Sequence, residues 1–263
     1  MSTVDVNVRG DLEIGGMSTG ELVETYGTPL MVYDERMIRE NARLFRNAFL
    51  ESGLQYQVAY ASKAFLCKEM VRLAEQEELS LDVVSGGELY TALEAGFPAE
   101  RIHFHGNNKS EEELIMALEA EIGCFVVDSF LELELLHDLA KEREQKVQIL
   151  IRVTPGVEAH THEYITTGQE DSKFGFSISN GQANTAIQLA LRKPYFSLLG
   201  LHSHIGSQIF EREGFDQAIQ VLADFLQKIR IEYDVTMPVL NIGGGFGVRY
   251  TEEDQPLPIP IYV

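Results

Sequence analysis

Cysteine and basic residues are both scarce in this sequence, and the scarcity of cysteine excludes one class of fold. Only two cysteines occur in the 263 residues, Cys67 and Cys124, and they form no C-x-x-C pair. The sequence therefore indicates no disulfide framework, which is typical of a protein from a reducing compartment. We expect both thiols to be packing residues and not nucleophiles.

The shortage of basic residues limits the possible binding partners. The sequence has 21 Lys and Arg against 41 Asp and Glu, a formal net charge of -20. A chain of this charge repels nucleic acid and anionic membrane surfaces, so we expect neither as a partner. Any phosphate must be held by local geometry, such as backbone amides at the start of a helix.

Long apolar runs are missing as well. The N-terminal stretch MSTVDVNVRGDLEIGG has neither a basic start nor an apolar core of signal-peptide length, and no segment reaches membrane-spanning length. We therefore expect a soluble, cytoplasmic protein. Its 44% of hydrophobic residues can bury a large core in one barrel-sized domain or in two smaller ones.

The sequence does contain a regular alternation of strand-like and helix-like runs. Short apolar strands separated by amphipathic segments predict βαβ units and a parallel sheet. The predicted strands are residues 55–62, 79–85, 102–106, 124–129, 147–155, 198–206 and 238–245. Three helices are predicted to begin at an S-x-x-E capping box, formed by Ser85 and Glu88, Ser110 and Glu113, and Ser129 and Glu132.

The predicted fold class is α/β, a (β/α)8 TIM-type barrel of which about seven βα units are present. After the seventh strand comes PLPIPIYV, whose prolines predict a loop and not a central eighth strand. An early helix with an apolar stripe and a short strand in PLMVYD precede the first barrel strand. We expect residues 1–35 to belong to a second structure and residues 36–263 to form the barrel, incomplete in this chain.

The residues at the carboxyl ends of barrel strands converge on one pocket, and here they are polar. The set comprises Lys63, Asp82, Ser85, His105, Asp128, Arg152, His202, His204, Ser207 and the glycines after Asn241. The run NIGGGFG, residues 241–247, lets backbone amides approach an anion without a Cβ in the way. It predicts either a phosphate site or simply a tight loop.

Three H-x-H pairs raise the question of a metal site. They are His103 with His105, His160 with His162, and His202 with His204. Positions two apart share one face of a strand, and neutral imidazoles are ligands for zinc and related ions, as in a barrel metallohydrolase. The usual metal-ligand spacings are missing, so we favour pocket walls or core histidines and predict no metal.

Lys63 lies in the run VAYASKAF, residues 58–65, at the point where a buried strand is predicted to stop. Such a lysine can simply reach solvent past the strand end. Together with a phosphate-holding loop it suggests a different chemistry, because an amine of lowered pKa attacks aldehydes. Pyridoxal 5'-phosphate offers an aldehyde and a phosphate handle, and it acts as an electron sink.

Three motifs in this order, YASKA, HSHIGSQ and NIGGGFG, resemble the fold type III pyridoxal-phosphate enzymes, the alanine racemase and basic amino acid decarboxylase group. Within that group, YGTPLMVYDE, LDVVSGGEL, HFHGNNKS and GVEAHTHEYITTGQEDSKFGF resemble the diaminopimelate decarboxylases. The likeness covers about residues 12 to 255. It implies an alanine racemase-like barrel and decarboxylation of meso-2,6-diaminopimelate to L-lysine and CO2.

The resemblance also implies roles for individual residues. Lys63 matches the lysine that bonds to the cofactor, and His204 matches the histidine that stacks on the cofactor ring, so these two are the candidate catalytic residues. Ser207 matches a group at the phosphate, and Asp82 lines the barrel near the lysine, as does Arg152. The glycines implied at the phosphate are Gly243, Gly244 and Gly245.

The sequence also departs from the family pattern in two respects. The family has a glutamate in an E-P-G-R motif that holds the pyridine nitrogen, and a C-terminal β-domain that brings a cysteine to the partner subunit's site; this sequence contains neither. We therefore expect the barrel portion of such an enzyme, with residues 1–35 contributing to the absent domain and activity incomplete in this chain alone. A homodimer acting on an amino acid is implied for the complete protein.

Several alternatives stay open at this point. Decarboxylases of ornithine, arginine or carboxynorspermidine use the same scaffold, although the segment THEYITTGQEDSKFGF argues against them. A non-catalytic barrel that carries the cofactor would need the lysine and the glycine run but no second domain. A metallohydrolase is the third alternative.

Overall fold

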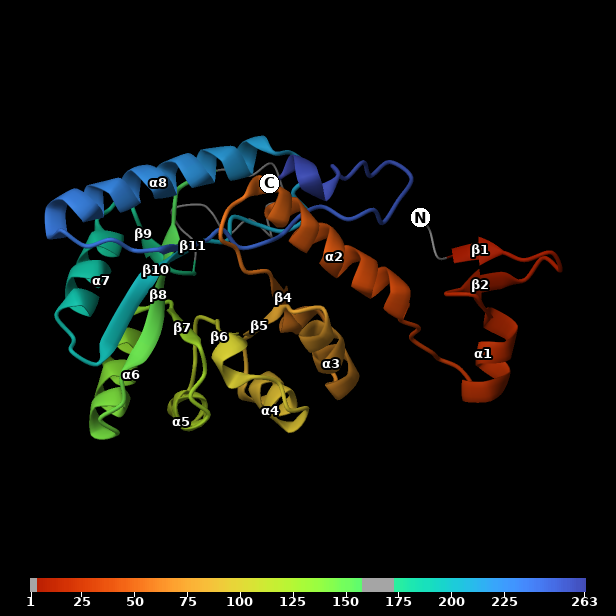
Figure 1. The fold of residues 1–263 in the computed structure, drawn as a ribbon, viewed down its shortest axis with the longest axis horizontal. Helices are drawn as coiled ribbons and strands as arrows, with labels where there is room; N and C mark the ends of the chain where they lie inside the picture. Colours follow the sequence, from red (N-terminus) through yellow and green to blue (C-terminus); the bar gives the residue numbers. More distant parts are fainter. Residues whose placement is uncertain (1–3, 158–172) are drawn as a thin grey trace. The chain divides into compact units, whose positions relative to one another are not determined.

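The computed structural model describes residues 4–157 and 173–263, and the chain divides into two compact units, Met1–Val58 and Ala59–Val263. Figure 1 shows the elements of both. Among the described residues, no helix combines the length and the apolar composition that crossing a membrane requires.

The first unit contains a small antiparallel sheet that the sequence patterns did not predict. Its elements are β1 (Val4–Val6), β2 (Leu12–Ile14), β3 (Met17–Ser18), α1 (Thr19–Tyr26) and α2 (Glu35–Ser52). The carboxylate of Asp34 caps α2 by accepting the Met37 amide at 3.2 Å, and Gly53 ends the helix in the left-handed conformation. The capped start and the glycine stop define α2.

The strand predicted in PLMVYD is wrong. Residues 30–34 form no regular structure. A strand needs a neighbouring strand for its ladder of backbone hydrogen bonds, and among the described residues the sheet partners in this unit are β1, β2 and β3. The apolar stripe predicted on the early helix is confirmed in part, since Ala42 is buried and Phe45 half-buried on α2.

The second unit is a parallel sheet curled into an incomplete barrel, which confirms the predicted fold class. Its strands are β4 (Ala59–Ala61), β5 (Ser80–Val83), β6 (Ile102–Phe104), β7 (Cys124–Val127), β8 (Val147–Thr154), β10 (Phe196–His202) and β11 (Val239–Asn241). They lie in the order β11-β10-β8-β7-β6-β5-β4, so neighbours in sequence are neighbours in space. A short additional strand, β9 (Phe176–Ser177), pairs with the end of β8 and was not predicted.

Helices follow the strands and cover the outside of the sheet (Figure 1). They are α3 (Lys68–Gln76), α4 (Gly86–Glu94), α5 (Glu111–Glu119), α6 (Phe130–Glu142), α7 (Gln182–Leu191) and α8 (Glu213–Tyr233). Strands β4 and β11 are half-buried or exposed, whereas the central strands β5 to β8 are largely buried, as in Leu81, Phe125 and Ile151, which are fully covered. Such strands read as continuous apolar runs, which is why the sequence revealed them.

The three predicted helix caps are confirmed, with a variation in two of them. The hydroxyls of Ser85, Ser110 and Ser129 each accept an amide hydrogen bond from the third helical residue. At Ser110 the glutamate side chain returns to the cap amide, which completes the capping box. At the other two caps, Glu88 and Glu132 accept instead from the amide one residue before the serine.

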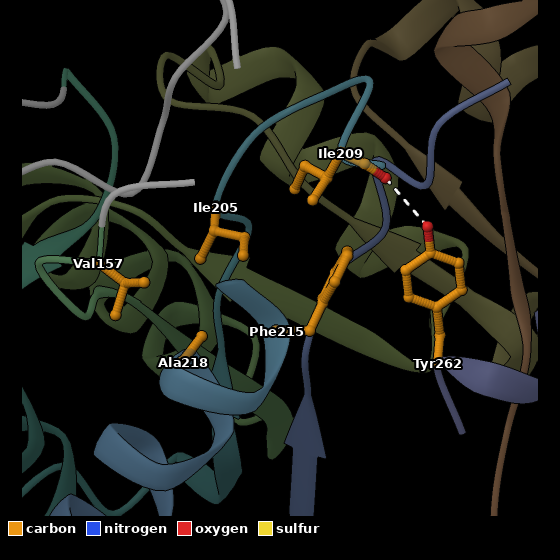
Figure 2. Packing of buried hydrophobic residues seen from close by; sticks show 6 residues of the cluster. All are labelled: Val157, Ile205, Ile209, Phe215, Ala218 and Tyr262. Carbon is orange, nitrogen blue, oxygen red and sulfur yellow. Dashed lines mark hydrogen bonds between the residues drawn. The ribbon is translucent and has the colours of Figure 1, made fainter. Parts of the chain in front are cut away.

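An apolar cluster lies beneath the loops that follow β10 and β11 (Figure 2). It contains Val157, Ile205, Ile209, Phe215, Ala218 and Tyr262. The Phe215 and Phe246 rings stack at 5.0 Å between centroids, and the Tyr262 ring meets Phe246 edge-on at 4.9 Å. Tyr262 follows the short 3-10 turn Ile259–Ile261, so the PLPIPIYV segment is a loop, as predicted.

Candidate active site

Strand register brings the predicted polar residues to one end of the sheet. On one side Asp82 of β5 is level with His103 of β6, and on the other Arg152, His202 and Asn241 are level across β8, β10 and β11. All five lie at or near the carboxyl ends of parallel strands. In a barrel this is the end at which catalytic groups gather.

Lys63 lies in the 3-10 turn Ser62–Ala64 directly after β4, and its side chain is exposed. Tyr60 braces this turn by donating its hydroxyl to the Phe65 carbonyl at 2.8 Å. The positive charge of Lys63 contributes to the lowered pKa of His204, so the two side chains are near enough to interact electrostatically. The lysine is thus at the barrel mouth, held by a turn and reachable from solvent.

The carboxylate of Asp82 bridges two imidazoles. Its Oδ1 lies 3.0 Å from His103 Nδ1, and its Oδ2 lies 3.3 Å from His105 Nε2. Burial by itself would raise the pKa of Asp82, but the two histidines outweigh burial and hold this pKa well below its usual value. Asp82 is therefore a fixed anion at neutral pH.

These three side chains also bear on the metal hypothesis. One ligand atom from each of Asp82, His103 and His105 lies within 4.8 Å of the others. The same contacts equally fit an arrangement without a metal, in which His103 is hydrogen-bonded to Asp82 and His105 makes an ion-pair contact with it. His160 and His162 lie outside the described residues, and within the described ranges His202 and His204 join no comparable group of donors.

His204 and His202 are held neutral. Burial lowers the pKa of His204 from 6.5 to about 4, and the positive charges of Lys63 and Arg152 add to this. Burial, with His105 and Arg152, likewise lowers the pKa of His202 well below its usual value. The His202 ring meets His105 edge-on at 4.7 Å. At neutral pH, His204 thus presents an uncharged ring to the mouth of the barrel.

Arg152 is paired with Asp128 across neighbouring strands. Arg152 Nη1 lies 3.0 Å from Asp128 Oδ2, and Asp128 Oδ1 accepts the Gly175 amide at 2.9 Å. The guanidinium carbon lies 4.3 Å above the centre of the Phe174 ring. The pair thus fixes residues 174–175 against the ends of β7 and β8.

Two loops complete the site, and they are here called the serine loop (residues 203–210) and the glycine loop (residues 241–248). Backbone hydrogen bonds join them, from the Ile209 amide to the Gly245 carbonyl and from the Gly247 amide to the Ile209 carbonyl. Gly243 and Gly245 have positive φ, and any Cβ there would collide with the serine loop backbone. Around Gly244 a Cβ would meet nothing within 4 Å, so this glycine borders open space.

The structure therefore brings Lys63, Asp82, His204, Ser207 and the glycine loop to one end of one sheet. The sequence reading missed two local anchors there, Gln208 and Asn241. The side chain of Asn241 accepts the Gly243 amide at 2.8 Å, and Gln208 bonds to Val248. The sequence indicates them only by their place in two motifs, Gln208 in HSHIGSQ and Asn241 in NIGGGFG. Of the cysteines, Cys124 is buried, and burial raises the pKa of its thiol to about 12, as fits a packing residue.

Comparison with known proteins agrees with this geometry. Residues 35–263 match the family described as pyridoxal-dependent decarboxylase, pyridoxal binding domain. The diaminopimelate decarboxylase of Bacillus subtilis (strain 168) is 60% identical over 257 residues, 98% of this chain and 58% of that protein. That of Bacillus methanolicus is 59% identical over 261 residues, 99% of this chain and 60% of its own.

A solved structure supports the same relationship. Diaminopimelate decarboxylase from M. jannaschii, in complex with L-lysine, superposes with a TM-score of 0.91 at 36% identity, covering 99% of this chain and 60% of that one. This chain thus spans about three fifths of the length of the relatives it matches.

Proposed function

Because this chain belongs to the pyridoxal-dependent decarboxylase family, we propose that the native protein containing it removes a carboxylate from meso-2,6-diaminopimelate, giving L-lysine and CO2. One observation carries the proposal: Lys63, His204 and the glycine loop share one end of the sheet in a chain about 60% identical to enzymes named for this reaction.

The described residues fit pyridoxal 5'-phosphate. Two buried polar atoms at the strand ends, His202 Nδ1 and Ser203 Oγ, have no hydrogen-bond partner among the described residues, as expected where a polar group binds nearby. The open space at Gly244 allows an anion to approach backbone amides. Lys63 is an accessible amine on the same side. The cofactor, when bound, supplies an electron sink for the bond that breaks.

Each residue has a defined task in this proposal. Lys63 would provide the amine that bonds to the cofactor aldehyde, and His204 would offer the cofactor an uncharged ring because its pKa is lowered. Ser207 and Gly243, Gly244 and Gly245 would hold the phosphate. Asp82 would contribute a fixed negative charge to the site and is itself in contact with two histidines.

Three wider features belong to the same proposal. Residues 1–35 contribute to a second domain, and residues 36–263 belong to the cofactor-binding barrel. The complete enzyme is a homodimer, as the family resemblance implies. It works in the cytoplasm, where the amino acid is made.

The first test combines absorbance, trapping and turnover on the native protein. Added pyridoxal 5'-phosphate should produce a long-wavelength band, and borohydride should convert it into a stable adduct that peptide mapping places on Lys63. CO2 should be released from meso-2,6-diaminopimelate and not from ornithine or arginine. Near-stoichiometric zinc with no bound aldehyde would overturn the proposal in favour of a metallohydrolase.

A further inference from the structure

Gln208 is the last residue of HSHIGSQ, and the proposed chemistry assigns it no task. It directly follows Ser207, and its backbone has a φ of 56°, a region that residues other than glycine enter rarely. The side chain explains this conformation. Its Nε2 donates to the Val248 carbonyl at 3.0 Å, and its Oε1 accepts the Val248 amide at 2.9 Å.

Gln208 thus makes a two-point clamp from the serine loop to the end of the glycine loop, 40 residues further along the chain. The clamp continues the backbone contacts made by the next residue, since Ile209 pairs with Phe246 as an isolated parallel bridge. Beyond this bridge, the two hydrogen bonds of the Gln208 amide take the place of backbone hydrogen bonds between the two loops. Both ends of the glycine run are therefore tied down, one by Asn241 and one by Gln208.

Tyr262 braces the same loops from below (Figure 2). Its hydroxyl lies 3.2 Å from the Ile209 carbonyl and 3.3 Å from the Phe210 carbonyl, so one donor serves the two residues that follow the clamp. The aromatic cluster with Phe215 and Phe246 fixes the Tyr262 ring. The serine loop is thus bonded to the glycine loop through Gln208 and to Tyr262 through the Ile209 and Phe210 carbonyls.

We propose that Gln208 and Tyr262 are positioning residues that hold Ser207 and Gly244 at a fixed separation, so that the two loops bind the cofactor's phosphate. The inference rests on the proposed function. Backbone amides bind an anion well only when they are held in place beforehand, because ordering a loop on binding costs free energy. This chain has a net charge of -20, so its overall field does not attract a phosphate. The affinity for phosphate must therefore come from well-placed amides in the two loops.

The test compares two aldehydes on the native protein, pyridoxal 5'-phosphate and pyridoxal, which lacks the phosphate. Gln208→Asn keeps an amide and a residue type that tolerates positive φ, but its side chain is too short to reach Val248. We expect about tenfold weaker binding of pyridoxal 5'-phosphate and unchanged binding of pyridoxal. Tyr262→Phe should act in the same direction with about a threefold effect, since it removes one shared hydrogen bond.

Gln220→Asn is the matched control, because Gln220 lies exposed on α8 and bonds only to Asp224 among the described residues. It should change neither affinity. Equal loss of both aldehydes in Gln208→Asn would overturn the inference and indicate a general disturbance of the site. Unchanged affinity for both would overturn it as well. If the unaltered protein binds neither aldehyde, the proposed function itself fails.

Discussion

The two sides of the candidate active site are built by different means. After β4 to β8, charged side chains hold one another, as Asp82 does with His103 and Arg152 with Asp128. After β10 and β11, backbone groups, glycines and one amide clamp hold two loops together. The first side contributes fixed charges and the Lys63 amine, whereas the second contributes uncharged backbone groups of the serine and glycine loops. A ligand with an aldehyde at one end and a phosphate at the other needs both.

Removing the amine should have the largest effect. Lys63→Ala is expected to abolish the borohydride-trapped adduct and to lower decarboxylation by roughly 10³-fold or more, because no other described group can take over the bond to the aldehyde. The fold should survive, since Lys63 is exposed beyond the end of β4. Intact mass after borohydride, with circular dichroism as the control for folding, tests this. An adduct retained in the variant would contradict the role of Lys63.

Filling the cradle should have the next largest effect. Gly244→Val places a branched side chain in the open space beside the glycine loop, where nothing lies within 4 Å of a Cβ. We expect binding of pyridoxal 5'-phosphate to weaken roughly 10- to 100-fold, with little change in stability of the cofactor-free protein. A titration followed by absorbance measures the first and thermal unfolding the second. Unchanged affinity would mean that the loop is only structural.

The smallest predicted effect is on the free energy of unfolding, and it concerns His204. This histidine follows β10 and interacts with Lys63 and Arg152 on the other side of the site. The pKa of His204 is about 4 in the folded protein and 6.5 when exposed, so the folded state binds fewer protons between these values. The stability that neutral His204 contributes is therefore full above pH 6.5 and is lost as the pH falls toward 4. From pH 7 to pH 5 this amounts to about 2 kcal/mol.

Urea unfolding of the cofactor-free protein at the two pH values, with His204→Gln beside it, checks this expectation. The variant should lose less stability on acidification than the unaltered protein. His202 titrates in both and cancels in the difference. Identical losses would show that His204 lies in a more solvated place than the structure indicates.

The sequence predicted the barrel better than the first unit, for a physical reason. Strands such as Cys124–Val127 are buried throughout and read as apolar runs, whereas Val4–Val6 is exposed and too short for any period to show. The strand predicted in PLMVYD failed because an apolar stretch does not reveal whether a pairing partner exists. The extra strand Phe176–Ser177 has only two residues and could not be recognised.

For the site, motifs identified single residues but not their partners. Lys63 and the glycine loop could be predicted because each stands in a local pattern. The bridge from Asp82 to His103 depends on the register of two strands, and the bond from Gln208 to Val248 spans 40 residues. No local sequence pattern predicts either contact, because the partners are far apart in the sequence. Only the folded chain shows which side chain meets which partner.

The helix caps described above also decide where negative ligands can go. The positive ends of α4, α5 and α6 would ordinarily attract anions. At each of them a glutamate of the protein, Glu88, Glu113 or Glu132, already accepts a backbone amide. Each glutamate places a negative charge at the start of its helix, which disfavours phosphates and carboxylates from outside at these three junctions. An anionic ligand is thereby directed away from them and toward the glycine loop, where Gly244 borders open space.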